Sequence, residues 1–479
     1  VPLSLAQRRM WFLNQFDPTQ PTYNIPAVLR INGDLDVDAL RESVTDLLVR
    51  HEVLRTSFPV VNGEPAQVVG DIAEFADRDV WSIVEAEQDL TNTVTSGFDV
   101  TTDWPIRIRL LRSNTDEFIL AVVVHHIASD GESMLPLVTD LTVAYAARVQ
   151  GKAPDFTPLE VQFADYAIWQ HSVLGSAADP ESTVGRQLGY WRDQLTGAPD
   201  VLDLPADRPR PLVASHRGAR ADFQIPAEVG ARVEAVAREH GVTPFMVVHA
   251  ALSTLLARLS ATADITVATP IAGRGDRVLD PLVGMFVNTL VLRTEVFAGV
   301  SFAELLEQVR TVDLDAFAHS DVPFETIVEA LDPVRSEAFS PLAQVMLSYD
   351  PAASVADTEV SVAGLEISPL AAPIVPAQLD LSVLVAPRGD GLDWAGSVVF
   401  APELFEESTV LWVADKFVRL LDVLTADTSI AVGDASWLSA DTVRAALDAA
   451  TGPEVVVPRG TVADALVARA ASTPELSAL

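Results

Sequence analysis

The feature that most constrains the fold is an apolar run at residues 118–124, which ends directly at His125 and His126. The run is apolar without alternation, which is typical of a strand covered on both faces. A helix is predicted directly after it, at 132–150. Because such a strand needs helices or a second sheet on each side, the run favours an α/β fold. It also places both histidines at a strand end, beside the N-terminus of a helix.

Helices and strands alternate on both sides of a proline-dense connector at 204–211. Upstream, the pattern predicts a strand at 26–33 and a helix that Asp36 caps. Downstream, the predicted helices lie at 227–240, 243–259, 301–318 and 403–425, and the predicted strands at 264–270, 283–294, 342–349, 380–386 and 393–400. We therefore expect two α/β lobes of similar size, 1–175 and 176–435. Residues 436–479 are expected to be a linker and the start of a further domain.

Composition excludes several classes of function. The 67 acidic residues outnumber the 32 basic ones, giving a formal net charge of −35, and the acids are dispersed along the chain. Such a surface repels phosphate backbones, so we expect no nucleic-acid partner. The chain has no cysteine, which removes disulfides, thiolate nucleophiles and cysteine zinc sites and fits a cytoplasmic location. No apolar run approaches the length of a membrane span, so no membrane partner is expected.

The adjacent histidines are the strongest candidates for chemistry. Neighbours on a strand point to opposite faces, so one of His125 and His126 is expected to face the core and the other an open side. A neutral imidazole takes or holds a proton well near neutral pH, and the backbone N–H groups after Gly131 are candidate donors to a developing oxyanion. The two rings diverge, and no cysteine or His-x-x-x-His spacing accompanies them, which argues against a metal site. On these residues alone, a pair of ordinary buried histidines stays open as the alternative.

Six segments together resemble the core motifs of one family, the condensation domains of nonribosomal peptide synthetases. They read SLAQRRMWFL at 4–13, RHEVLRTSF at 50–58, HHIASDG at 125–131, DYAIWQ at 165–170, VGMFVNTL at 283–290 and HSDVPFE at 319–325. Any one of them is a weak signal, but six in the family's order are specific. In addition, TVADAL at 461–466 is similar to the start of an adenylation domain.

The resemblance implies two lobes, each with the fold of chloramphenicol acetyltransferase, that form a V-shaped pseudo-dimer with a tunnel between them. It implies an acyltransferase that makes amide bonds. In that reaction, the amine of an aminoacyl group on a downstream carrier protein attacks the peptidyl or aminoacyl thioester on an upstream carrier protein. Both substrates arrive on phosphopantetheine arms, and no cofactor is expected to bind the domain directly. An adenylation domain is expected beside it in the same polypeptide.

The resemblance also assigns roles within the histidine motif. His126 is expected to do the chemistry, either by accepting the proton of the amine or by holding the amine. His125 is expected to support it from the core side. Asp130 is expected to form a structural salt bridge, with Arg274 as the first candidate partner. Gly131 is expected to leave room for a substrate arm next to the histidine.

Three further residues are expected to support the site. Arg55 is the second candidate partner for Asp130. Asn288 is expected to line the tunnel near its centre. Arg50 is expected either at the tunnel or lobe interface, or in a purely structural position.

The motifs also bear on rival functions within the family. Epimerization domains share the histidine motif but are expected to lack the pattern seen at 283–289, and heterocyclization domains carry an aspartate-based motif instead. A recruitment domain that binds oxygenases without catalysis would have a degraded histidine motif. The alternatives to an amide-forming condensation domain are therefore a catalytically silent platform for carrier proteins, or an epimerization domain. The long insertion between Gln170 and Tyr190 resembles that of domains that accept a D-configured donor terminus.

Overall fold

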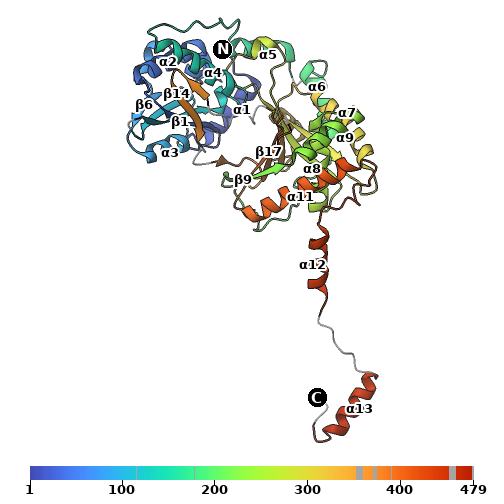
Figure 1. Ribbon diagram of the computed structural model, residues 1–479. Coiled ribbons are helices and arrows are strands. Elements are labelled where there is room, and N and C mark those ends of the chain that lie inside the picture. The colour runs from blue at the N-terminus through green and yellow to red at the C-terminus, as the bar shows by residue number, and fades with distance from the viewer. Residues whose placement is uncertain are drawn as a thin grey trace. The chain divides into compact units, whose positions relative to one another are not determined.

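The computed structural model describes residues 1–114, 116–176, 179–351, 360–370, 375–389, 391–452 and 460–476. The chain forms two compact units, Val1–Ala435 and Ser436–Leu479. The first unit contains two lobes, each built on its own sheet (Figure 1). The second contains helices α12 (Ala440–Ala450) and α13 (Val462–Ser472). Residues 453–459, within the expected linker, lie outside the described residues.

The first lobe is built on a six-stranded sheet with the order β13-β14-β1-β8-β7-β6. Its strands are β1 (Asn24–Asn32), β6 (Trp81–Val84), β7 (Ile106–Arg112), β8 (Glu117–His125), β13 (Val360–Val362) and β14 (Leu365–Leu370). The predicted buried strand is β8, which pairs antiparallel with β1 and β7, and its last six residues are all buried. The helices of this lobe are α1 (Leu5–Phe16), α2 (Val37–Arg50), α3 (Glu87–Thr95) and α4 (Met134–Arg148). Because α3 packs on β7 and β8, and α1 contacts the turn after β8, helices cover this strand and the turn.

The second lobe is built on a seven-stranded sheet with the order β11-β10-β12-β16-β17-β9-β15. Its strands are β9 (Arg217–Ile225), β10 (Asp264–Ile271), β11 (Asn288–Glu295), β12 (Val345–Tyr349), β15 (Val375–Pro376), β16 (Leu381–Ala386) and β17 (Trp394–Phe400). The remaining helices are α5 (Phe163–Leu174), α6 (Thr183–Leu195), α7 (Ala227–His240), α8 (Pro244–Ser260), α9 (Phe302–Ala318), α10 (Phe324–Leu331) and α11 (Glu407–Ala426). Of these, α8 is apolar on nearly all sides, and it packs between α7, α9, α11 and β10.

Two strands of the first sheet come from the second half of the chain. Strand β14 pairs antiparallel with β1, with Ile31 opposite Ile367, and β13 extends the sheet beyond it. The predicted division at 175/176 is therefore wrong for residues 360–370, which belong to the first lobe. The physical reason is that β1 would otherwise be an open edge with unpaired N–H and C=O groups.

Most predicted elements are confirmed, and one differs. The Asp36 side chain caps α2 by accepting a hydrogen bond from the N–H of Ala39. The strand predicted at 283–294 begins only at Asn288, because backbone N–H groups at 284, 286 and 287 bond to the side chains of Ser133 and Asp130 rather than to a neighbouring strand. The stretch 171–189, which the resemblance gives as an insertion, contains the end of α5 and the start of α6 among its described residues.

The segment before β11 joins the two lobes through apolar packing. Leu279, Leu282, Val283, Met285 and Phe286 belong to the same buried cluster as the core of the first lobe. The Phe286 ring meets the Phe163 ring edge to face, with centroids 5.0 Å apart. The end of the histidine motif therefore faces a segment of the second lobe that packs into the first.

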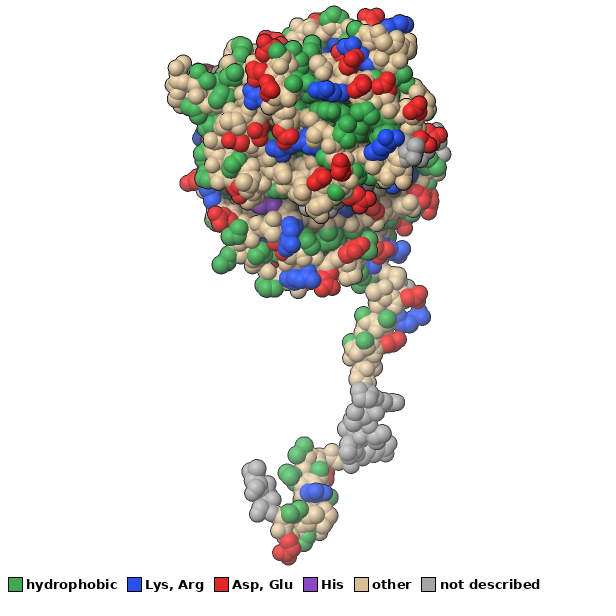
Figure 2. Space-filling view, turned by 90° about the vertical axis from the view of Figure 1, so that its left-hand side faces the viewer, with side chains coloured by type: hydrophobic (Ala, Val, Ile, Leu, Met, Phe, Trp, Pro, Cys, Tyr) green, Lys and Arg blue, Asp and Glu red, His purple; other side chains and the backbone are tan. Residues whose placement is uncertain are grey.

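On the face shown in Figure 2, charged side chains of one sign do not gather into a large patch. Acidic side chains are scattered there among basic, polar and apolar ones. This agrees with the dispersed acids of the sequence. Among the described residues, no single helix has the length and apolar character needed to cross a membrane. Only α7 and α8 taken together do, and that pair is bent by 107°.

Candidate active site

The two histidines lie where β8 ends and a short 3₁₀ turn, His126–Ala128, begins. The N–H of His126 donates to the carbonyl of Tyr23 at 2.8 Å, and Nδ1 of His125 accepts from the N–H of Ile127 at 3.1 Å. His125 is 2% exposed and packs edge-on against Phe98, with centroids 5.9 Å apart. His126 is half-buried and lines a cavity. One histidine thus faces the core and the other an open side, as expected.

Burial keeps both histidines neutral at ordinary pH. Loss of solvation, with smaller contributions from His126 and Arg107, lowers the pKa of His125 to about 3. Burial also lowers the pKa of His126, although backbone hydrogen bonding and the Asp130 carboxylate oppose the shift. A neutral His126 has a lone pair that can accept a proton or a hydrogen bond.

Asp130 is at the centre of a buried network that joins the two lobes. It is 1% exposed, and its Oδ1 accepts from the N–H and the hydroxyl of Ser133 at 2.9 and 2.6 Å. Its Oδ2 accepts from the N–H groups of Phe286 and Val287 at 2.9 and 3.1 Å. Nη1 of Arg274 lies 3.2 Å from the same oxygen. A carboxylate with this many donors is fully satisfied, and it fixes the histidine turn to the segment before β11.

Arg274 is itself held by both lobes. It donates to the Ser133 hydroxyl at 2.9 Å and to the Leu282 carbonyl at 3.1 Å, and it lies 4.3 Å above the Phe286 ring. The expected contact of Asp130 with Arg274 is therefore present. Arg55 does not take this position, because it donates to the carbonyls of Leu48 and Gly70 and pairs with Glu52.

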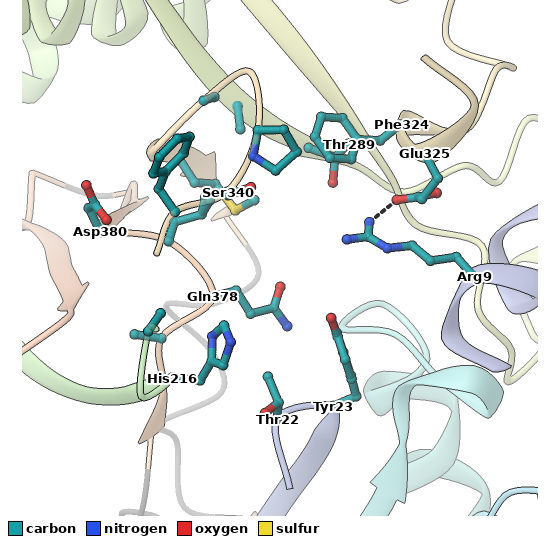
Figure 3. A pocket seen from close by; sticks show the side chains of 18 of the residues that line it. Arg9, Thr22, Tyr23, His216, Thr289, Phe324, Glu325, Ser340, Gln378 and Asp380 are labelled. Atoms are coloured by element: carbon teal, nitrogen blue, oxygen red, sulfur yellow. Dashed lines mark hydrogen bonds and ion pairs between the residues drawn. The ribbon is translucent and has the colours of Figure 1, made fainter. Parts of the chain in front are cut away.

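A cavity of about 270 Å³ lies between the lobes beside His126 (Figure 3). The first lobe contributes Ala6, Arg9, Met10, Thr22, Tyr23 and His126. An ion pair crosses it, because Arg9 of α1 bonds to Glu325 of α10. A second cavity of about 270 Å³ shares Thr22 and His216 with the first. The described residues contain no group of three or more His, Asp or Glu side chains that could hold a metal ion.

A sequence model of the family described as "Condensation domain" matches residues 1–446. The chain belongs to this family. Condensation domains of nonribosomal peptide synthetases are amide-bond-forming acyltransferases, and the chain is assigned to that enzyme class.

Two curated relatives of this condensation domain are nonribosomal peptide synthetases. A probable non-canonical nonribosomal peptide synthetase, CymA of Salinispora arenicola, is 42% identical over 100% of the chain and 6% of its own length. A dimodular nonribosomal peptide synthase of Bacillus subtilis is 40% identical over 92% of the chain and 19% of its own length. The chain thus spans a small fraction of these relatives.

Solved structures give the same fold. An X-domain from teicoplanin biosynthesis is 31% identical, with a TM-score of 0.81 over 91% of the chain and 97% of that structure. The four-domain synthetase AB3403 matches with a TM-score of 0.80 over 92% of the chain and 34% of that structure, and at 22% identity it shows the fold alone. The expected mixed α/β architecture of condensation domains is confirmed.

Two of the expected support residues of the condensation domain occupy different settings. Asn288 lines the cavity, and its amide donates to the carbonyls of Ser320 and Val322 at 2.9 and 2.8 Å. Its oxygen accepts from the N–H groups of Thr289 and Phe324, so its hydrogen-bonding capacity is used within the protein.

Arg50 is not among the residues that line the cavity. It donates to Asp140 at 2.7 Å and to the carbonyl of Thr157, and lies 4.6 Å over the Phe156 ring. It therefore ties α2 to α4, which corresponds to the structural alternative expected for it.

Gly131 is exposed, and a Cβ added to it would meet no atom within 4 Å. Its φ lies outside the left-handed region, so neither packing nor the backbone requires glycine there. The expectation that it leaves space for a substrate stays a prediction.

Sequence reasoning missed several polar residues that line the cavity together with His126. Arg9 and Glu325 lie within two of the six motifs, which could have marked them as functional residues. Nothing in the motifs indicates that the two side chains pair. Tyr23, His216 and Gln378 lie outside the motifs. His216 has a positive φ of 53°, a conformation that no sequence pattern indicated.

Proposed function

We propose that this condensation domain joins two carrier-bound substrates by a peptide bond. The amine of a downstream aminoacyl group attacks the carbonyl carbon of an upstream peptidyl or aminoacyl thioester. The C–N bond forms, the C–S bond breaks, and the lengthened chain stays on the downstream carrier. The observation that carries this proposal is His126, which is neutral and opens into a cavity lined by both lobes.

In this reaction His126 accepts the proton that the amine loses as the C–N bond forms. The same proton is then available to the departing thiolate, so the proton balance closes. Asp130 does not touch the substrates; it positions the histidine turn through Ser133 and the segment before β11. Much of the rate enhancement comes from holding two tethered substrates together.

The partners proposed are the upstream and downstream carrier proteins and an adenylation domain in the same polypeptide. Their phosphopantetheine arms are part of the substrates rather than a resident cofactor. Support comes from the relatives, which are multidomain peptide synthetases of which this chain matches one part.

A D-configured donor terminus is proposed on the sequence resemblance at 171–189. None of the described residues of this stretch lines the cavity beside His126.

A silent carrier-binding platform is the second candidate. What favours a docking role is that the teicoplanin X-domain, 31% identical over 92% of the chain, was solved in complex with another protein, OxyB. The intact HHIASDG segment, with Asp130 fully bonded, favours the enzyme over this alternative.

The test is a single-turnover assay with two carrier domains loaded with a panel of aminoacyl groups in D and L form. We expect amide product on the downstream carrier, with faster transfer from D-terminated donors. Carrier binding without product from any pair would show a silent platform. Faster transfer from L-terminated donors would reject only the stereochemical part.

Gly131→Ala is expected to slow amide formation without changing the stability of the domain. The free energy of unfolding should change by less than about 0.5 kcal/mol, because the added methyl meets no protein atom. The rate of amide formation should fall by roughly 10-fold or more, because a small displacement of a tethered substrate is costly. The matched control is Gly189→Ala in α6, where a Cβ also meets nothing. A full rate for Gly131→Ala would show that no substrate passes this position.

A further inference from the structure

Tyr23 stands beside His126 on the same cavity. It lies directly before β1, and its carbonyl accepts the N–H of His126 at 2.8 Å. Its ring is tilted against the ring of His125, with centroids 6.4 Å apart. Figure 3 shows its hydroxyl turned into the cavity, on the side of Arg9 and Gln378. One residue thus holds the backbone of the histidine turn and presents a hydroxyl to the space where the reaction takes place.

The attack of an amine on a thioester needs a hydrogen-bond donor as well as an acceptor. Negative charge develops on the carbonyl oxygen, and donors aimed at it supply a large part of the stabilisation in acyl transfer. From the sequence, the backbone N–H groups after Gly131 are candidates for this role. The structure uses two of them elsewhere, because the N–H of Ser133 donates to Asp130 and that of Met134 to the carbonyl of Gly131.

Two other polar side chains on the cavity already have partners. The amide of Asn288 donates to the carbonyls of Ser320 and Val322, and Arg9 forms an ion pair with Glu325. Within the described part of the chain, no hydrogen bond involves the Tyr23 hydroxyl, and Figure 3 draws none to it. It is therefore a free donor in the half of the cavity that carries His126. The hydroxyl of Thr289 and the amide of Gln378, both on the second lobe, are the competing candidates.

We propose that Tyr23 is a second catalytic residue, whose hydroxyl donates a hydrogen bond to the carbonyl oxygen of the donor thioester. This inference rests on the proposed function. As the amine attacks, the π electron pair moves onto the carbonyl oxygen, which the hydroxyl then bonds more strongly. No proton leaves Tyr23: the amine proton goes to His126, and collapse of the adduct restores the C=O bond and expels the thiolate.

The protonation states of Tyr23 and His126 suit a hydrogen-bond donor and a proton acceptor. Burial raises the pKa of Tyr23; Arg9 opposes the shift and Glu325 adds to it. The phenol therefore stays protonated at neutral pH and can donate. Burial lowers the pKa of His126, so the imidazole stays neutral and can accept. Two groups whose surroundings keep them in complementary protonation states are suited to the donor and acceptor roles.

The experiment compares Tyr23→Phe, Thr289→Val and the wild-type domain in the loaded-carrier assay. Tyr23→Phe keeps the ring that packs against His125 and removes only the hydroxyl. Its rate constant at saturating substrate should fall by roughly 10²-fold with little change in KM, since the lost interaction strengthens in the transition state. Thr289→Val tests a competing donor, and under this proposal it should lose much less rate than Tyr23→Phe. The matched control is Tyr190→Phe, whose hydroxyl is buried, has no partner and does not line the cavity.

A second variant keeps the test independent of folding. Tyr23→difluorotyrosine retains the hydroxyl but makes it more acidic. The rate should hold at neutral pH and fall as the pH rises through the lowered pKa of this phenol, because the ionised group no longer donates. A purely structural tyrosine would produce no such alkaline limb.

The outcomes separate the two proposals. A Tyr23→Phe rate within threefold of wild type, or a change confined to KM, overturns the role of Tyr23 while the wild type still makes amide. A large loss in Thr289→Val with none in Tyr23→Phe assigns the donor to the second lobe. Absence of product from the wild type with every loaded pair rejects the proposed function, and the role of Tyr23 with it.

Discussion

His126→Ala is expected to slow amide formation by roughly 10²- to 10⁴-fold while the domain stays folded. The side chain is half-buried and faces the cavity, so its removal takes away the proton acceptor without opening the core. Residual activity should persist, because holding the two substrates together contributes independently of the histidine. Single-turnover rates with loaded carriers, alongside the thermal midpoint of each variant, provide the measurement. His240→Ala, at the end of α7 and away from the cavity, is the matched control and should retain the wild-type rate.

The pH dependence of the same reaction distinguishes proton acceptance from positioning. The active form of His126 is neutral, so activity is present above its pKa and is lost as the pH falls through it. Because burial lowers this pKa below the ordinary 6.5, the acidic limb should lie below pH 6.5. The limb should disappear in His126→Ala. Persistence of an unchanged limb in that variant would show that His126 positions the amine without taking its proton.

Asp130→Ala is expected to destabilise the domain by about 3–5 kcal/mol and to lower the rate as well. The substitution leaves a buried arginine without its counter-ion, since the Arg274 side chain is 6% exposed. It also removes the acceptor for the N–H groups of Phe286 and Val287. Chemical denaturation of the purified domain measures the loss.

Two comparisons make this prediction specific. Asp222→Ala removes one member of an exposed pair with Arg220, with side chains 69% and 52% exposed, and should cost less than about 1 kcal/mol. Asp130→Ala/Arg274→Met removes both buried charges and should recover part of the loss, because no unpaired charge remains. Equal costs for Asp130→Ala and Asp222→Ala would contradict a buried network at the lobe junction.

Local pattern was sufficient for much of the fold. Apolar pattern located β1, β8, β10, β16 and β17, and the helices α2, α7, α8 and α9, within a few residues. Most of these bury one face, which periodicity records, whereas β8 and α8 are covered on nearly all sides and show as unbroken apolar segments. The cap at Asp36 is equally local, since it joins residues three positions apart.

Local pattern failed where the backbone bonds to distant groups. Residues 283–287 have the composition of a strand, yet their N–H groups bond to Ser133 and Asp130, about 150 positions earlier. The pairing of β14 with β1 joins residues more than 300 positions apart. No propensity of either segment encodes its partner, because tertiary contacts override local preference.

The sequence by itself determined the class of site: a histidine pair at a strand end, with an aspartate and a glycine after it, in a chain with no cysteine. It also determined that one histidine faces the core, because strand neighbours diverge. Only the tertiary structure selected Arg274 over Arg55 as the partner of Asp130, paired Arg9 with Glu325 across the cavity, and placed Tyr23 beside His126. These contacts join segments that meet only when the two lobes pack, and they form because a buried charge or donor must be satisfied by whatever group the packing brings to it.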